Sequence, residues 1–275
     1  MNRGHSVSMG LKDIRYAVAG SLSYLTSGLL FLRESNVPPA LEISGECFIK
    51  DHATEIRDSG IELLVCLAFP KILTRSELDL FPRGCINLHA GLPKYRGRHP
   101  IPWMLIDGVD EIPVSIHFMD EGIDSGDIIL QDTVLVSRDD NYASVLNKVH
   151  SLGNELLFSA IHQIASGTAH RKKQHQIKMG YRAKRKPSDS KVSLSMSSID
   201  LHRTINALSD PMPNAFCETK NGEEIVFAQS FIGDQPGEVL AKTECGKYIV
   251  STGDGVIFVE TRSSLVVGDK LLQSE

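Results

Sequence analysis

The residues best suited to chemistry lie in residues 84–103, which read GCINLHAGLPKYRGRHPIPW. A β-rich run ends there on Asn87 and His89, and glycines, prolines and three cations follow. Because Asn87 and His89 are two positions apart, their side chains point to the same face of a strand. An amide beside an imidazole can stabilise an oxygen that becomes negative during acyl transfer. A purely structural hydrogen-bonding pair at a strand end is the alternative interpretation.

A second cluster, residues 119–128 (MDEGIDSGDI), holds four carboxylates. Gly122 and Gly126 allow a positive φ, so we expect a tight loop that turns carboxylates back over the sheet edge. Asp124 or Asp127 could then reach His89 and act as a base. A solvated acidic turn and a cation site made of oxygen ligands are the alternatives.

The elements around these clusters alternate between strand and helix. Five of them precede the first cluster: strands at residues 14–19, 40–43 and 61–69, and helices at 22–34 and 48–59. Residues 61–69 (IELLVCLAF) are continuously apolar, as in a buried parallel strand. The alternation predicts an α/β fold with a mostly parallel sheet, whose ligands bind at the carboxyl ends of the strands.

Further elements follow both clusters. We expect strands at residues 85–89, 114–119 and 127–136, the last as an antiparallel edge pair, and a helix at 142–166. A polar linker rich in Lys and Arg then leads to a helix at residues 197–208. Beyond it, short strands at 216–218, 224–229, 237–241, 248–251 and 256–260 are separated by turns at Asn221-Gly222, Asp234, Gly246 and residues 253–255. This spacing predicts a small β-barrel.

The predicted domains are therefore residues 1–185 and 190–275, with a basic linker at 167–190. The net charge of −5 is unevenly distributed between them, because residues 190–275 carry seven Lys or Arg against twelve Asp or Glu. Residues 1–189 hold 22 of each and are neutral. An acidic second domain is a poor platform for a polyanion.

Composition excludes several classes of protein. With 41% hydrophobic and 23% charged residues the 275-residue chain can bury a core. No apolar stretch long enough for a membrane span or a secretory signal is present, so we expect a cytoplasmic protein without membrane association. The five cysteines are widely spaced and form no CxxC pair, which favours free thiols over disulfides or a zinc site.

Taken together, NLHAGLPKYRGRHPIPW and MDEGIDSGDI closely resemble the signature of the N10-formyltetrahydrofolate-dependent formyltransferases. That family includes enzymes acting on methionyl-tRNA, on glycinamide ribonucleotide and on nucleotide sugars. AFPKIL (residues 68–73) resembles its folate loop, and RKPSDSKVSLS (185–195) resembles its interdomain junction. The last third resembles its small C-terminal domain. The resemblance implies a Rossmann-like formyltransferase domain followed by a small OB-like β-barrel.

By position, the catalytic residues of the family fall on Asn87, His89 and Asp124. The resemblance implies that an amine attacks the formyl carbon of N10-formyltetrahydrofolate, the cosubstrate. Asn87 and a protonated His89 would stabilise the oxyanion, and Asp124 would accept the amine proton. No metal is required. The pterin would contact two loops, at Leu67, Ala68, Phe69, Lys71 and Ile72 and at Glu121, Gly122 and Ile123.

The acceptor is the least determined part of the activity. The tRNA members of the family carry a basic inserted loop that residues 40–60 lack, and the second domain is acidic. We therefore expect a nucleotide-linked amino sugar, a dTDP or UDP 4-amino-4,6-dideoxy sugar for surface polysaccharide such as lipopolysaccharide. The groups expected to bind it are Lys94, Tyr95, Arg96, Arg98 and Trp103.

Other functions remain open. A methionyl-tRNA formyltransferase is the first alternative, and a non-catalytic folate or nucleotide-sugar binding protein is the second. The second is disfavoured because Asn87, His89 and Asp124 are all present. Glycinamide ribonucleotide enzymes resemble only the first domain, and a folate deformylase with water as acceptor would use the same three residues. We also expect a homodimer and no nucleic-acid partner. The turn after His89 is one residue shorter than is common in the family.

Overall fold

The computed structural model describes residues 14–174, 181–182, 185–193, 195–218, 224–232, 241–242, 248–251 and 256–261. Several predicted features lie outside the described residues: the turns at Asn221-Gly222, Asp234, Gly246 and 253–255, residues 237–240 of one strand, and residues 175–180 and 183–184 of the basic linker. The chain forms two compact units. The first comprises residues 1–97, 113–134 and 148–181, and the second 98–112, 135–147 and 182–275. The predicted ranges 1–185 and 190–275 stay a prediction.

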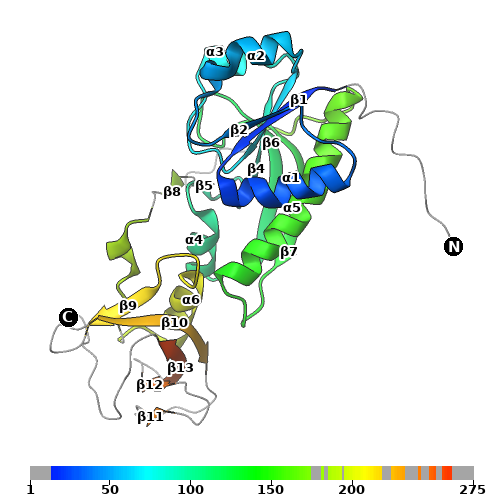
Figure 1. The fold of residues 1–275 in the computed structure, drawn as a ribbon. Coiled ribbons are helices and arrows are strands. Elements are labelled where there is room, and N and C mark those ends of the chain that lie inside the picture. Colours follow the sequence, from blue (N-terminus) through cyan, green and yellow to red (C-terminus); the bar gives the residue numbers. More distant parts are fainter. Residues whose placement is uncertain are drawn as a thin grey trace. The chain divides into compact units, whose positions relative to one another are not determined.

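A six-stranded mixed sheet is the centre of the first unit, in the order β2-β1-β3-β4-β6-β7 (Figure 1). Its strands are β1 (Tyr16–Gly20), β2 (Leu41–Ser44), β3 (Leu63–Leu67), β4 (Cys85–Ala90), β6 (Glu111–Phe118) and β7 (Ile128–Leu135). The first four pair in parallel, whereas β6 runs antiparallel to β4. Strands β1 and β3 are buried along their whole length, as their apolar sequences require. The predicted Rossmann-like, mostly parallel sheet is confirmed.

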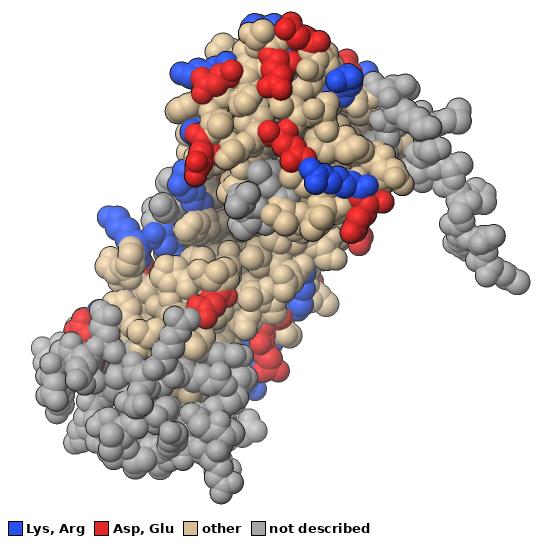
Figure 2. Space-filling model, in the orientation of Figure 1, with Lys and Arg blue, Asp and Glu red and all other residues tan. Residues whose placement is uncertain are grey.

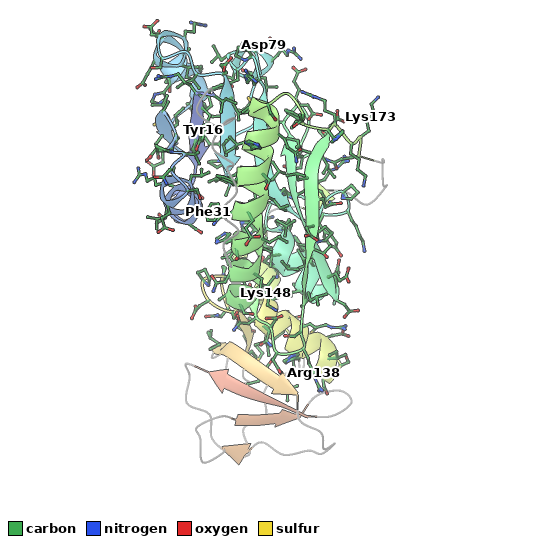
Figure 3. The ribbon with its side chains drawn as sticks, turned by 90° about the vertical axis from the view of Figure 1, so that its right-hand side faces the viewer. Tyr16, Phe31, Asp79, Arg138, Lys148 and Lys173 are labelled. Carbon is green, nitrogen blue, oxygen red and sulfur yellow. The ribbon has the colours of Figure 1, made fainter. Side chains whose placement is uncertain are left out.

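Helices α1 (Leu22–Glu34) and α5 (Tyr142–Ala165) pack on one face of the sheet. They contact each other edge to face through Phe31 and Phe158, whose ring centroids lie 6.4 Å apart (Figure 3). Helix α5 approaches β4 so closely that a Cβ at Gly153 would lie 2.4 Å from Leu88 Cδ1. Apolar burial between these layers supplies most of the stability of this face.

The opposite face of the sheet is covered by shorter elements. These are the 3₁₀ turn η2 (Ile49–His52), α2 (Ala53–Asp58) and α3 (Arg75–Leu78). The single helix predicted at residues 48–59 is thus a 3₁₀ turn that continues into one α-helical stretch. Helix α3 was not predicted, because four residues show no periodicity; a capping box between Thr74 and Glu77 defines its start.

The second unit contains α4 (Pro100–Ile106), η3 (Pro187–Ser190), α6 (Ser198–Ala207) and a five-stranded sheet. The order of that sheet is β11-β12-β13-β10-β9, from β9 (Ala215–Glu218), β10 (Glu224–Ile232), β11 (Ala241–Lys242), β12 (Tyr248–Ser251) and β13 (Val256–Thr261). Each strand of this sheet pairs antiparallel with its neighbour in the described residues. Leu201 and Ile205 of α6 pack with Phe227, Ile257 and Val259 in its core. Closure of this sheet into a barrel stays a prediction.

Two short strands, β5 (Arg96–Gly97) and β8 (Tyr181–Arg182), form a separate pair. Within the described residues, no helix is both long and apolar enough to cross a membrane. Cys47, Cys66, Cys85 and Cys217 are free thiols, and Cys245 lies outside the described residues.

Candidate active site

The carboxylate of Asp124 is the meeting point of the candidate site. Its Oδ2 accepts a hydrogen bond from the backbone N–H of Gly97 at 2.9 Å and lies 3.6 Å from Nδ1 of His89. Its Oδ1 accepts from the side-chain amide of Asn87 at 3.4 Å and lies 3.7 Å from Nε2 of His117. The structure therefore brings together Asn87, His89 and Asp124, the three residues expected to be catalytic.

Strand β4 explains how Asn87 and His89 come to share one face. In the register with β6, Asn87 lies opposite His117 and His89 lies opposite Ser115. Side chains alternate along a strand, so these four positions project to the same side of the sheet. The acidic loop between β6 and β7 folds back over this face and places Asp124 beside it.

His117 was not predicted as a site residue, although it is 1% exposed and lies beside Asp124. Its Nδ1 donates to the backbone carbonyl of Phe118 at 2.8 Å, which leaves Nε2 to accept from the amide of Asn87 at 3.2 Å. Burial lowers the pKa of His117 from 6.5 to about 4, so its ring is neutral at neutral pH. The signal in the sequence was a single histidine inside the apolar strand VSIHFM.

His89 is fixed by a different partner. Its Nε2 lies 2.8 Å from the backbone carbonyl oxygen of Tyr95, and since a carbonyl only accepts, Nε2 carries a proton. Nδ1 is thereby the nitrogen that faces Asp124. Nδ1 is therefore the ring nitrogen of His89 that is placed to exchange a proton with a neighbouring group.

The acidic loop reaches the site through a strained backbone. We expected positive φ at Gly122 and Gly126, but the structure has it at Asp124, with φ 49°. The glycines serve close approach instead: a Cβ at Gly126 would lie 2.0 Å from the carbonyl oxygen of Phe118. Asp120 closes the turn by accepting from Ser125 Oγ at 2.6 Å. A strained backbone conformation of this kind persists only where the surrounding structure holds it.

The predicted folate loops have mixed roles. Ile72 and Ile123 expose 64% and 42% of their surface, an unusual state for large apolar side chains that a flat, largely apolar ligand would relieve. Ala68 adopts a left-handed φ of 52° directly after β3. Residues Phe69, Glu121 and Gly122 lie in the same two loops and are at least partly exposed. These residues fit a folate, and their contacts with it stay a prediction.

Two of the residues predicted to bind folate, Leu67 and Lys71, instead contact other parts of the protein. Leu67 is buried beneath α1, close to Gly28. The ammonium group of Lys71 donates to the carbonyls of Gly45 and Cys47 at 2.7 and 2.9 Å and lies 4.6 Å from the centre of the Phe48 ring. Lys71 therefore ties the loop after β3 to the loop after β2.

The predicted acceptor residues are also divided. Tyr95 is 3% exposed, so its ring is buried and it gives the site its carbonyl oxygen rather than a stacking surface. The guanidinium of Arg96 donates to the side chain of Gln174 at 3.0 Å, while Lys94 and Arg98 are exposed. Trp103 belongs to the second unit, where the guanidinium of Arg185 lies 4.7 Å from its ring. Substrate binding by Lys94, Arg96, Arg98 and Trp103 stays a prediction.

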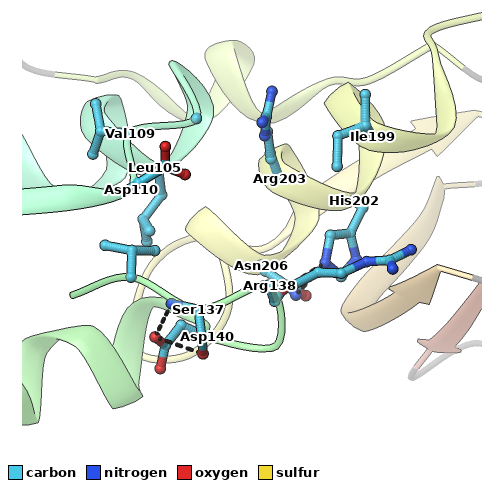
Figure 4. A pocket seen from close by; sticks show the side chains of 12 residues that line it. Leu105, Val109, Asp110, Ser137, Arg138, Asp140, Ile199, His202, Arg203 and Asn206 are labelled. Atoms are coloured by element: carbon cyan, nitrogen blue, oxygen red, sulfur yellow. Dashed lines mark hydrogen bonds between the residues drawn. The ribbon is translucent and has the colours of Figure 1, made fainter.

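A shallow groove of about 170 Å³ lies within the second unit (Figure 4). Its walls include Arg138, His202 and Arg203, and none of the three candidate catalytic residues. Both ring nitrogens of His202 are hydrogen-bonded, Nδ1 with Ser230 Oγ and Nε2 with the carbonyl of Arg138, each at 3.0 Å. Asp140 on the groove floor accepts from the backbone and hydroxyl of Ser137. The groove therefore offers no comparable set of reactive groups.

Comparison with known proteins agrees with this geometry. Residues 42–161 match the formyl transferase family, and residues 184–264 match the formyl transferase C-terminal domain. The chain belongs to the formyl transferase family. This family uses N10-formyltetrahydrofolate as its formyl donor. The described residues contain no group of three or more His, Cys, Asp or Glu side chains placed to hold a metal.

Curated proteins include similar sequences that are named methionyl-tRNA formyltransferases. The methionyl-tRNA formyltransferase of Desulfotalea psychrophila is 33% identical over 72% of this chain and 62% of its own length. That of Syntrophus aciditrophicus is 33% identical over 76% of this chain and 70% of its own length. The chain thus spans about two thirds of the length of these relatives.

Several solved structures share the fold of this chain. Methionyl-tRNA formyltransferase from Clostridium thermocellum has a TM-score of 0.65 at 15% identity, covering 95% of this chain and all of its own. The N-formyltransferase of Helicobacter canadensis, in complex with folinic acid and dTDP-3-aminofucose, has 0.64 at 19%, over 90% and 99%. HypX of Aquifex aeolicus, in complex with tetrahydrofolic acid, has 0.72 at 18%, over 90% and 43%. At these identities the likeness shows the fold alone.

The prediction of a nucleotide-linked amino sugar as acceptor is wrong. Seven curated relatives at 30–33% identity are all named methionyl-tRNA formyltransferases. That prediction relied on the net charge of the second domain. Net charge is a poor guide to phosphate binding, because charges farther apart than about 8–10 Å are screened at physiological salt. Figure 2 shows Lys and Arg interspersed with Asp and Glu over the described part of one face. A summed charge cannot say which of these groups a phosphate would meet.

Proposed function

We propose that this formyl transferase moves a formyl group from N10-formyltetrahydrofolate to the α-amino group of methionine carried on tRNA. The observation that carries formyl transfer is the carboxylate of Asp124, which contacts Asn87 and lies beside His89 Nδ1. The observation that favours the acceptor is the identity of 30–33% to methionyl-tRNA formyltransferases.

In the reaction, the amine nitrogen bonds to the formyl carbon, and the bond from that carbon to N10 of the folate then breaks. Negative charge develops on the formyl oxygen between these events. The amide of Asn87 has one N–H directed at His117 and a second, only weakly bonded to Asp124 at 3.4 Å, that can donate to this oxygen. Apo hydrogen bonds of such length are common at catalytic sites and shorten when the substrate binds.

His89 supplies the second contact to the oxygen, through the proton on Nδ1. Its Nε2–H is held by the carbonyl of Tyr95, so only Nδ1 is free to face the reacting groups. Asp124, 3.6 Å away, stabilises the charged imidazole ring. The same carboxylate accepts the proton that the amine loses, directly or through a water, and a proton returns to N10 of the departing folate.

The residues around the loops fit the formyl donor. Exposed Ile72 and Ile123 offer apolar surface to a pterin, and the turn at Ala68 brings backbone groups to the same edge of the sheet. For the tRNA, the exposed cations Lys94, Arg171 and Lys173 of the first unit can contact phosphates. A homodimer and a cytoplasmic location stay predictions.

The experiment is a formylation assay with N10-formyltetrahydrofolate and methionyl initiator tRNA, with a panel of dTDP and UDP amino sugars in parallel. N-formylmethionine released from the tRNA is detected by mass spectrometry. We expect formylation of the charged tRNA and none of the uncharged tRNA. Formylation of a sugar without formylation of the tRNA would contradict the proposal.

Salt dependence gives a second measurement. Contacts to phosphates release counterions, so the KM for methionyl-tRNA should rise steeply between low and moderate salt. The KM for the formyl donor should change much less over the same range. An equal dependence for both substrates would contradict the use of a polyanionic acceptor.

A further inference from the structure

Gln174 lies outside the motifs that point to formyl transfer, yet its side chain contacts the catalytic loop. Its Nε2 donates to the backbone carbonyl of Asp124 at 3.0 Å and to that of Gly126 at 2.7 Å. Its Oε1 accepts from the guanidinium of Arg96 at 3.0 Å. Both N–H groups and the oxygen of this amide are therefore engaged.

The two carbonyls that Gln174 serves belong to the strained part of the loop. Asp124 holds a left-handed φ of 49°, a backbone conformation that is strained for a residue other than glycine. Its carbonyl and that of Gly126 both point to the amide of Gln174. Without these donors, two partly buried acceptors would lose their partner and the loop would relax.

The backbone around Gln174 is fixed to both ends of the same loop. Lys172 exchanges two hydrogen bonds with Ile128, at 2.8 and 2.9 Å, directly after the loop. The guanidinium carbon of Arg171 lies 3.7 Å from the ring centre of Phe118, directly before the loop. Gln174 thus follows directly on residues that contact both ends of the loop.

A closed ring of contacts results. Gln174 holds the backbone of Asp124 on one side and Arg96 on the other. Arg96 adjoins Gly97, whose N–H donates to the Asp124 carboxylate at 2.9 Å. The backbone and the carboxylate of one residue are therefore positioned from the same point.

We propose that Gln174 is a positioning residue for formyl transfer: its amide holds the strained loop so that the carboxylate of Asp124 faces Asn87 and His89. The residue acts through Asp124 and does not itself touch the substrate. This inference rests on formyl transfer by this chain, and on the tRNA acceptor only for the assay.

The test is Gln174→Met, which keeps an unbranched side chain of similar length and removes all three hydrogen bonds. The matched control is Gln163→Met on α5, whose Oε1 has no hydrogen-bond partner among the described residues. We expect Gln174→Met to lower kcat by about 30-fold to 100-fold, as for a small misplacement of a catalytic group. The KM for the formyl donor should change much less than kcat, because the folate contacts expected at residues 67–72 lie in the other loop. The control should retain wild-type kcat.

A double-mutant cycle separates positioning from general destabilisation. In an Asp124→Ala background, Gln174→Met should cause no further loss of kcat, because the group it positions is gone. An additional loss equal to that seen in the wild-type background would overturn the inference, as would an unchanged kcat in the single variant. If Gln174→Met does not fold, Gln174→Glu replaces it, with the same expectations.

A crystal structure of Gln174→Met gives a readout without activity. We expect Asp124 to leave the left-handed region and its carboxylate to lose the bond to Gly97. Retention of both features would overturn the inference. Absence of tRNA formylation by the wild-type protein would instead contradict the proposed acceptor, so the two failures are distinguishable.

Discussion

The side-chain amide of Asn87 donates to Nε2 of His117 at 3.2 Å, between residues that lie directly opposite on β4 and β6. Because Nδ1 of His117 is bonded to the carbonyl of Phe118, Nε2 of the neutral ring can only accept. If the amide were flipped, the oxygen of Asn87 would face Nε2 of His117, and two acceptors would repel each other. His117 therefore directs the N–H groups of Asn87 toward the site.

Two substitutions at His117 should separate its two ring nitrogens. Gln places an oxygen near the position of Nε2 and can still accept from Asn87, whereas Asn reproduces only the donor at Nδ1. We expect His117→Gln to keep a kcat about tenfold or more above that of His117→Asn, the span of one misdirected donor. Steady-state formylation kinetics measure this, and the reverse order would exclude the orienting role.

The burial of His117 also predicts how stability depends on pH. Its pKa is about 4 in the folded protein against 6.5 when exposed. Above pH 6.5 the ring is neutral in both states and contributes nothing. Between pH 6.5 and 4 the unfolded chain binds a proton that the folded protein does not, so stability falls.

At pH 5 this loss should be on the order of 2 kcal/mol relative to pH 7.5. The measurement is the free energy of unfolding by urea at both values, for wild type and for His117→Gln. The variant lacks the titrating ring and should lose that much less on acidification. Equal losses in both proteins would show that His117 does not titrate in this range on unfolding.

The carboxylate at Asp124 should be needed for turnover and not for binding. Asp124→Ala and His89→Ala are each expected to lower kcat by about 10²-fold to 10⁴-fold, the usual effect of removing a general acid or base. Affinity for the formyl donor, measured by calorimetry, should stay within a few-fold. Asp127→Ala is the matched control, because it removes a carboxylate from the same loop, and should leave kcat near that of wild type.

Glycine at position 126 should be required by space. A methyl group there would lie 2.0 Å from the backbone oxygen of Phe118, which cannot move without disturbing β6. At Gly122 the nearest atom is the hydroxyl of Ser125, at 2.1 Å, which can rotate away. We expect Gly126→Ala to lower kcat by about 10²-fold and Gly122→Ala to have a much smaller effect. Thermal denaturation and kcat of the two variants, measured side by side, would reject this explanation if they proved alike.

Local sequence patterns predicted much of the fold. Helices α1, α5 and α6 begin and end within one residue of their predicted bounds, because each has a clear apolar stripe and an identifiable end. The strands of the first unit follow from apolar runs closed by glycine or polar residues. The short helices α3 and α4 were not predicted, because four to seven residues are too few to show a helical period.

Charge summed along the sequence was a poor guide to the acceptor. Recognition of a phosphate depends on a few cations within screening distance, and a domain total averages them with remote acids. Identity to relatives over most of the chain corrected this prediction.

By itself, the sequence determined which side chains could react: two-residue spacing sets Asn87 and His89 on one strand face, and an acidic glycine-containing loop follows. The resemblance to the family assigned Asp124, but only the tertiary structure decided what brings this carboxylate to them and holds it there. The choice of Asp124 over Asp127 depends on a left-handed φ and on hydrogen bonds from Gly97 and Gln174. These partners lie far from one another along the chain, and antiparallel register and loop closure bring them together. Such long-range geometry leaves no periodic trace in the sequence.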